Sequence, residues 1–309
     1  MGLRLAAVAV VLAALLWAAG CAGDGQDASG RSLTVVATTT QAGDIVRAVG
    51  GNRVEVRGIL RPNSDPHEYE PRPSDARALQ GAKLVVRSGG ELDSWLGGLL
   101  SSVGGHVPTL TLIDSVRTRR NGSGVDPHWW QDPANGARAA AAVRDALAKA
   151  DPAGRTTYRR NAAHYIRRLR TLDRSIAACI ARIPPPKRKL VTSHDALGYY
   201  AERYGLRVIG ALIPSLSTNA QPSARDIERL VSQIEGERVE AIFPESSLNP
   251  KLERAVSRET GAEVGKALWA DSLGPKGSSG ATYLGSLKAN TAALVSGLSG
   301  GSVSCTPRG

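Results

Sequence analysis

The sequence predicts an α/β fold of two lobes, each built on a parallel sheet, joined by a single long helix. From residue 33 onward, short β-rich runs alternate with helical patterns, which is typical of strand–helix–strand units. A continuous helical pattern of about eight turns then covers residues 155–183, and a second alternating half follows. We therefore expect an N-terminal lobe at 33–150, a linking helix within 151–186 and a C-terminal lobe at 187–298.

The N-terminal lobe shows four strand patterns with helical patterns between them. Asp132-Pro133 combines a capping residue with a first-turn proline, which indicates that an Ala-rich helix starts there and runs over 134–150. The expected strands are 33–38, 54–60, 83–88 and 109–113, and the expected helices between them are 41–49, 74–80 and 91–100.

The linking helix is expected to end at Pro184-Pro185-Pro186, because proline cannot continue a helix. Asn249-Pro250 repeats the combination of cap and proline in the second half. The tail at 299–309 is rich in Gly and Ser and is expected to be loose. The expected strands of the C-terminal lobe are 190–193, 206–210, 241–244 and 263–269, and its expected helices are 196–204, 223–236, 250–260 and 283–298.

The N-terminus has the pattern of a bacterial lipoprotein signal. Arg4 gives a positive start, and the apolar run 5–19 is too short for a comfortable membrane span. Small residues precede Cys21, which resembles a lipobox and predicts a signal peptide at 1–20 and lipidation of Cys21. Residues 21–32 are then a polar, flexible tether. The alternative is an ordinary cleaved signal in which Cys21 has no special role.

The net charge and its distribution narrow the classes of binding partner. The formal net charge is +11, but the basic residues do not cluster with aromatic residues, so we expect no nucleic-acid partner. We interpret the charge as a solvated surface or one that faces anionic lipid.

In an oxidising compartment Cys179 and Cys305 can form a disulfide that pins the tail to the linking helix. The alternative is two separate thiols.

Three histidines lie in short polar motifs, and the tripeptide Asp-Pro-His occurs twice, ending at His67 and His128. His194 ends an expected strand, and Asp271 follows another. All four residues lie beyond the carboxyl ends of expected strands, two in each lobe, where open α/β sheets bind ligands. Three imidazoles and one carboxylate complete the coordination of a transition metal such as zinc. The sequence therefore predicts a metal site between the lobes.

Other candidate ligands fit this pattern less well. His106 lies after two glycines, and His164 lies within the linking helix, so both are expected to be ordinary surface or core residues. Glu245 ends an expected strand and is a rival carboxylate, but its sequence context also fits a helix cap and turn.

The ordered motifs resemble the zinc/manganese-binding receptors of bacterial ABC importers over essentially the whole chain after the signal peptide. The resemblance implies Rossmann-like lobes, with His67, His128, His194 and Asp271 as ligands of one metal. It also implies a monomeric, non-enzymatic receptor, lipid-anchored outside the cell membrane or periplasmic, that serves a permease with a cytoplasmic ATPase. The motifs are DPHEYEPRPSD (65–75), DPHWWQDP (126–133), TSHDALGYY (192–200), QPSARDIERL (221–230), IFPESSLNPKLERAVSRETGAEV (242–264) and WADSLG (269–274).

The metal expected is Zn²⁺ in preference to Mn²⁺. In the resembled family a histidine at the third ligand position goes with zinc, and three nitrogens suit zinc better than manganese. Residues 107–125 lack the His-rich loop of many zinc receptors, so manganese stays an alternative. Two other classes also remain open: a secreted zinc hydrolase, which would need an open metal position for water, and a surface adhesin that happens to bind metal.

Overall fold

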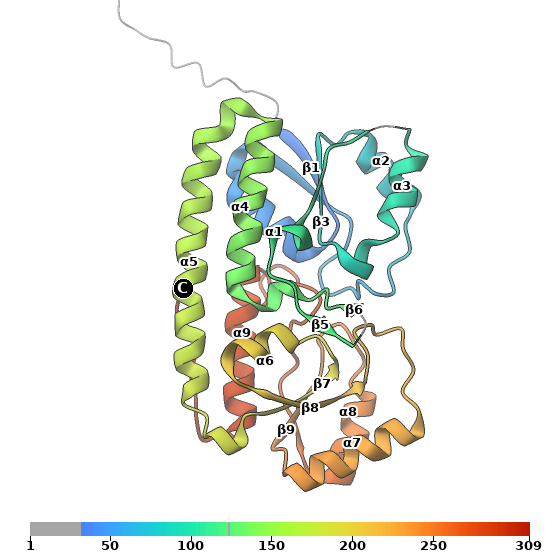
Figure 1. Cartoon of the computed structure of the whole chain (residues 1–309), viewed down its shortest axis with the longest axis vertical. Helices are drawn as coiled ribbons and strands as arrows, with labels where there is room; N and C mark the ends of the chain where they lie inside the picture. Colours follow the sequence, from blue (N-terminus) through green and yellow to red (C-terminus); the bar gives the residue numbers. More distant parts are fainter. Residues whose placement is uncertain (1–31, 105, 123) are drawn as a thin grey trace, which may run out of the picture. The chain divides into compact units, whose positions relative to one another are not determined.

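Two four-stranded parallel sheets organise the chain, and helices cover their faces (Figure 1). This confirms the predicted α/β class. The computed structural model describes residues 32–104, 106–122 and 124–309, and Ser32–Gly309 form one compact unit. The signal peptide, Cys21 and nearly all of the expected tether lie outside the described residues. Among the described residues, no helix is both long enough and apolar enough to cross a membrane.

The sheet of the N-terminal lobe has the strand order β2-β1-β3-β4. Its central strands are fully buried at Val35 and Val85, as expected for a parallel sheet covered on both faces. The Thr39 hydroxyl accepts a hydrogen bond from the Ala42 N–H and caps the first helix. The elements are β1 (Leu33–Ala37), α1 (Thr40–Gly50), β2 (Val54–Gly58), α2 (Pro73–Gln80), β3 (Leu84–Arg87), α3 (Leu96–Ser102) and β4 (Thr109–Thr111).

The sheet of the C-terminal lobe has the order β10-β9-β7-β8. The Ser223 side chain and Asp226 form a capping box at the start of α7. The elements are β7 (Lys189–His194), α6 (Gly198–Tyr204), β8 (Arg207–Ile213), α7 (Ala224–Glu237), β9 (Ala241–Phe243), α8 (Lys251–Thr260) and β10 (Glu263–Val264).

Among the strands, one expectation was wrong and one pair was missed. The strand expected at 263–269 is only the short β10, and beyond it the pairing resumes as a single parallel bridge between Leu268 and Glu245. A hairpin formed by β5 (Arg120–Asn121) and β6 (Gly124–Val125) was not predicted at all. Strands this short give no periodic pattern that a sequence can reveal.

Three long helices lie beside the sheets, and the last of them contacts both lobes. They are α4 (Pro133–Ala150), α5 (Arg155–Ala181) and α9 (Tyr283–Leu298). The backbone N–H of Tyr283 donates to Asp44 on α1 at 2.9 Å, whereas Gly297 packs on Phe243 of β9. One continuous hydrophobic core includes residues of both sheets and of all three helices. The long helix α5 is therefore not alone in holding the lobes together.

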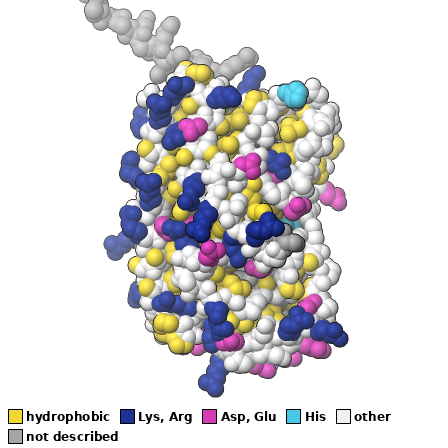
Figure 2. Space-filling view, in the orientation of Figure 1, with side chains coloured by type: hydrophobic (Ala, Val, Ile, Leu, Met, Phe, Trp, Pro, Cys, Tyr) yellow, Lys and Arg dark blue, Asp and Glu magenta, His cyan; other side chains and the backbone are white. Residues whose placement is uncertain are grey.

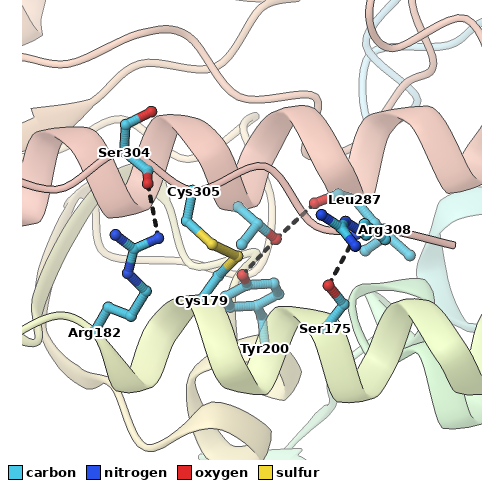
Figure 3. The surroundings of a disulfide bond; sticks show 9 residues. Ser175, Cys179, Arg182, Tyr200, Leu287, Ser304, Cys305 and Arg308 are labelled. Carbon is cyan, nitrogen blue, oxygen red and sulfur yellow. Dashed lines mark hydrogen bonds between the residues drawn. A yellow bond between two sulfur atoms is a disulfide. The ribbon is translucent and has the colours of Figure 1, made fainter.

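The C-terminal tail lies against α5 and is not loose as expected. Cys305 forms a disulfide with Cys179 of α5, with a Cα–Cα distance of 5.6 Å (Figure 3). Three residues further on, the backbone N–H of Arg308 donates to Ser175 Oγ at 2.9 Å. The high Gly and Ser content suggested a loose segment, but the disulfide that the sequence offered as one of two alternatives and the hydrogen bond to Ser175 hold it against α5.

Candidate metal centre

Four side chains from separate parts of the chain meet where the two lobes face each other. His67 lies in the loop after β2, and His128 directly precedes a short helical turn, Trp129–Gln131. His194 is the last residue of β7, and Asp271 follows the bridge that Leu268 makes with Glu245. One potential ligand atom from each of the four lies within 4.8 Å of all the others. These are the four residues that were predicted from the sequence to form a metal site.

The ring nitrogens converge on the carboxylate. Asp271 Oδ2 lies 3.0 Å from the Nε2 atoms of both His67 and His194. His128 Nε2 lies 3.4 Å from His194 Nε2 and 3.4 Å from Asp271 Oδ1. Tetrahedral ligands at about 2.0–2.1 Å from zinc lie roughly 3.3–3.4 Å apart, so these separations are of the right size. The four side chains are at most 4% exposed, so water is largely excluded.

Both Asp-Pro-His motifs form the same tight turn. Asp65 Oδ1 accepts from the backbone N–H of His67 at 2.9 Å, and Asp126 Oδ1 accepts from that of His128 at 2.9 Å. An Asp side chain that bonds the backbone two residues on stabilises such a turn, and the intervening proline fixes one backbone angle. The repeated tripeptide therefore reflects a repeated local structure that presents a histidine ring.

His128 is held by a chain of charged groups. Its Nδ1 lies 2.7 Å from Asp126 Oδ1, and Asp126 Oδ2 accepts from Arg119 Nη1 at 2.6 Å. Gly198 leaves space for this guanidinium, because a Cβ atom at residue 198 would lie 1.7 Å from Arg119 Nη1 and would displace it. A carboxylate on the far nitrogen fixes the ring orientation and leaves Nε2 for the metal. Sequence reasoning missed Arg119, because its place depends on the unpredicted hairpin.

His194 has its own carboxylate partner. Glu245 Oε2 lies 2.9 Å from His194 Nδ1, on the side of the ring away from the cluster. Glu245 Oε1 accepts from the backbone N–H of Asp271 at 3.2 Å and from Ser247 Oγ at 2.9 Å. Glu245 is therefore not one of the converging groups. Its side chain contacts the outer nitrogen of His194 and the backbone of Asp271, and so orients two of them.

The loop that carries Asp271 is fixed by residues next to His128. Trp130 Nε1 and Gln131 Nε2 both donate to the Ala270 carbonyl, at 2.8 Å and 2.7 Å. On the other side, Thr218 of the C-terminal lobe donates to Asp65 at 2.7 Å. The two lobes thus contribute to one pre-organised site, and each stabilises the other's loops.

The charges in this cluster are strongly coupled. Burial disfavours the charged form of His128, but the Asp271 charge and the bond to Asp126 outweigh it and raise the pKa of His128 to about 9. Burial is outweighed in the same way at His194, where Asp271 and Glu245 raise the pKa well above its usual value. The Asp271 pKa is well below its usual value, since both imidazoliums outweigh burial. Burial and the Asp271 charge raise the pKa of Glu245.

One carboxylate oxygen of the cluster has no hydrogen bond among the described residues, and it lies 3.4 Å from the ring nitrogen His128 Nε2. This atom is Asp271 Oδ1, and it is buried. A buried carboxylate oxygen without a partner is costly, and a cation in the cluster would satisfy it. His106 and His164 are both exposed and lie outside the cluster. The donor set of three nitrogens and one carboxylate fits a divalent transition metal.

Comparisons with known proteins show the family of the chain. The family model described as zinc-uptake complex component A, periplasmic (ZnuA), matches residues 35–297. The manganese-binding lipoprotein MntA of Halalkalibacterium halodurans is 31% identical over 94% of this chain and 97% of its own length. The iron-binding protein YfeA of Yersinia pestis is 31% identical over 89% of this chain and 90% of its own.

A solved structure shows the same architecture. The periplasmic zinc-binding protein TroA of Treponema pallidum superposes with a TM-score of 0.81 at 28% identity, covering 87% of this chain and 99% of that one. The chain belongs to the ZnuA/TroA family of metal-binding substrate-binding proteins of ABC transporters, which are receptors and not enzymes.

Proposed function

We propose that this receptor captures one divalent transition metal between its lobes and delivers it to an import permease driven by a cytoplasmic ATPase. His67, His128, His194 and Asp271 are the proposed ligands. The observation that carries the proposal is their convergence in a buried cluster in which Asp271 Oδ1 lacks a hydrogen-bond partner among the described residues. The metal is the cargo of the protein and not a resident cofactor.

A closed set of four protein ligands favours carriage over catalysis. A catalytic zinc keeps one position open for water and needs a general base close to it. Here the carboxylates nearest the cluster face the outer nitrogens of His128 and His194, and the four proposed ligands leave no position for water. Together with the family, this argues against the zinc hydrolase that the sequence left open.

Zinc is the proposed cargo, and manganese is the alternative. Three imidazole nitrogens suit zinc, whereas manganese prefers oxygen ligands. Both oxygens of Asp271 face the rings, Oδ2 toward His67 and His194 and Oδ1 toward His128, so a bidentate carboxylate would add the oxygen that manganese prefers. The printed names of the relatives include manganese and iron as well as zinc, so family membership does not decide between these metals.

We further propose that a lipid on Cys21 anchors the receptor, as a monomer, to the outer face of the membrane. Three of the relatives that span most of this chain are named lipoproteins. The polar run 22–32 then separates the anchor from the first strand.

Metal uptake by cells tests this function. A strain without the gene would carry the wild type, Asp271→Asn or His164→Asn, and uptake of radiolabelled zinc would be measured under zinc limitation. We expect the wild type and His164→Asn to restore uptake. Asp271→Asn should fail although it reaches the cell surface in equal amount, because the anionic ligand is gone.

Two results would contradict the proposal. If the Asp271→Asn strain takes up zinc as fast as the wild type, the assignment of Asp271 as a ligand is wrong. If deletion leaves uptake of zinc and of manganese unchanged but abolishes surface attachment, the adhesin interpretation is right instead.

A further inference from the structure

One face of α5 carries a row of arginines, which we call the arginine face. Its members are Arg159, Arg160, Arg167, Arg170 and Arg174, all exposed. At about 100° per residue, they fall within an arc of roughly 100° opposite the buried side of the helix. Lys and Arg side chains gather along the side of the molecule where Figure 1 places α5 (Figure 2).

The arginine face is not neutralised by the protein. Asp173 is the only acidic residue of α5, and it accepts from Arg203 Nε at 2.6 Å. Among the described residues, no ion pair involves any member of the arginine face. Some surface cations elsewhere are paired, as in Arg53 with Asp151 at 2.9 Å and Lys187 with Glu240 at 2.8 Å. Five arginines without an ion pair in the described part of the chain therefore share one face of this helix.

The spacing of the face works against the stability of the helix itself. Arg170 lies three residues after Arg167 and four before Arg174, so like charges stand one turn apart and repel each other. Such an arrangement becomes favourable when an anionic partner covers it.

Hollows beside the arginine face are lined by the same side chains. A hollow of about 580 Å³ lies between α4 and α5 and is lined by Arg144, Arg159, Arg167 and Arg170. Its one acidic group, Asp145, is paired with Arg144 at 2.7 Å. A second hollow, of about 700 Å³ on the α1 side, is lined by Arg47, Arg160, Arg167, Arg168 and His164, and its acidic group Asp44 already accepts from Tyr283. Guanidinium groups match phosphate oxygens in geometry, so these hollows suit phosphate-bearing headgroups.

The start of the described chain lies at the same end of the lobe as the start of α5. Leu33 pairs with Val54 in the sheet, and the preceding Arg53 binds Asp151, which lies just before α5. The eleven residues 22–32 reach at most about 36–40 Å, and α5 is about 40 Å long. A lipid on Cys21 would thus allow α5 to lie along the membrane.

We propose that the arginine face docks on the anionic phospholipid of the membrane that carries the receptor. This proposal rests on the anchoring part of the proposed function and is independent of the metal site, because no member of the face belongs to the ligand cluster. Phosphate oxygens accept hydrogen bonds from the guanidinium groups, and the lipid surface supplies the negative charge that the chain itself does not place there.

Vesicle flotation tests the proposal without the lipid anchor. The chain from Ala22 onward retains the whole compact unit Ser32–Gly309 and all of the described core. We expect it to float with phosphatidylcholine vesicles that contain phosphatidylglycerol, and not with phosphatidylcholine alone. The combined variant Arg159→Gln, Arg167→Gln, Arg170→Gln should bind about a hundredfold more weakly, since each basic residue at such a surface contributes roughly a factor of five. Added salt should release the wild type.

The matched control removes three exposed arginines of the C-terminal lobe, through Arg225→Gln, Arg254→Gln and Arg258→Gln. It lowers the net charge equally and should bind as the wild type does. Failure of the wild type to bind, or equal loss in the control, would overturn the proposal. So would wild-type binding to soluble polyglutamate with no enrichment on the anionic vesicles, which would assign the face to an acidic protein. Zinc binding by both variants, measured without vesicles, should stay unchanged, so failure here is separable from failure of the metal site.

Discussion

Replacing Asp271 with alanine is expected to weaken zinc binding more than any other single change. Asp271 is the one anionic member of the cluster, and both of its oxygens face histidine rings. Asp271 Oδ2 lies 3.0 Å from Nε2 of both His67 and His194, so the variant loses the ligand at the centre of the site. Loss of a group that merely orients a ligand costs roughly 10–100-fold, so loss of this ligand should exceed 100-fold. Competition with a chelator of known affinity would measure the change.

A buried aspartate outside the cluster provides the control. Asp93 is fully buried, accepts from Thr38 Oγ1 at 2.7 Å and pairs with Arg87 at 2.7 Å. Asp93→Asn should lower the melting temperature but leave zinc affinity unchanged. An Asp271→Ala protein that binds zinc as tightly as the wild type would contradict the assignment of the site.

Replacing His194 with alanine should have the next largest effect. The variant loses one nitrogen ligand and also leaves Glu245 without the ring that it faces. The two buried carboxylates Glu245 and Asp271 are then no longer separated by the imidazole that contacts both of them. We expect zinc affinity to fall by more than about 100-fold, and stability to fall by about 1–3 kcal/mol, the usual cost of a buried polar group without its partner. Chelator competition and thermal unfolding would measure the two effects.

The matched control for His194 is a histidine of the same chain outside the site. His164 is exposed on α5, so His164→Ala should leave both zinc affinity and stability unchanged. If His194→Ala retained wild-type affinity, or if His164→Ala lost it, the metal would have to bind elsewhere.

Contacts between the lobes hold the loops that carry the proposed ligands, so release of the proposed cargo would disturb them. The loop of His67 is tied to the C-terminal lobe by Thr218, and the loop of Asp271 is tied to Trp130 and Gln131 of the N-terminal lobe. The shared core and α9 restrict large separations, because α9 packs on both lobes. Small displacements of the loops that carry the ligands would therefore break fewer contacts during release than a wide opening of the lobes.

Local signals were enough to predict most of the fold and the four residues of the cluster. Asp132 with Pro133 marked the start of α4, and the apolar pattern gave the bounds of α9. The positions of His194 and Asp271 followed from the rule that parallel strands present ligands at their carboxyl ends. Resemblance to the family then related these scattered motifs to one site.

The groups that support the cluster were not predictable, because they depend on contacts between distant segments. Arg119 donates to Asp126 in a space that Gly198, far along the chain, leaves open. Glu245 has the sequence context of a turn, and its place beside His194 appears only when β7 and β9 pair. The tail looked loose because its Gly and Ser content is high, and only the pair Cys179 and Cys305 indicated in the sequence that it could be held against α5.

Competitive metal loading tests the central claim most directly. The chain from Ala22 onward would be stripped of metal, loaded anaerobically with equal amounts of zinc and manganese, and submitted to elemental analysis. A single closed cluster of His67, His128, His194 and Asp271 predicts about one metal per chain, most of it zinc. Full occupancy by manganese with zinc absent would contradict the choice of metal, and a protein that retains neither metal would contradict the site itself.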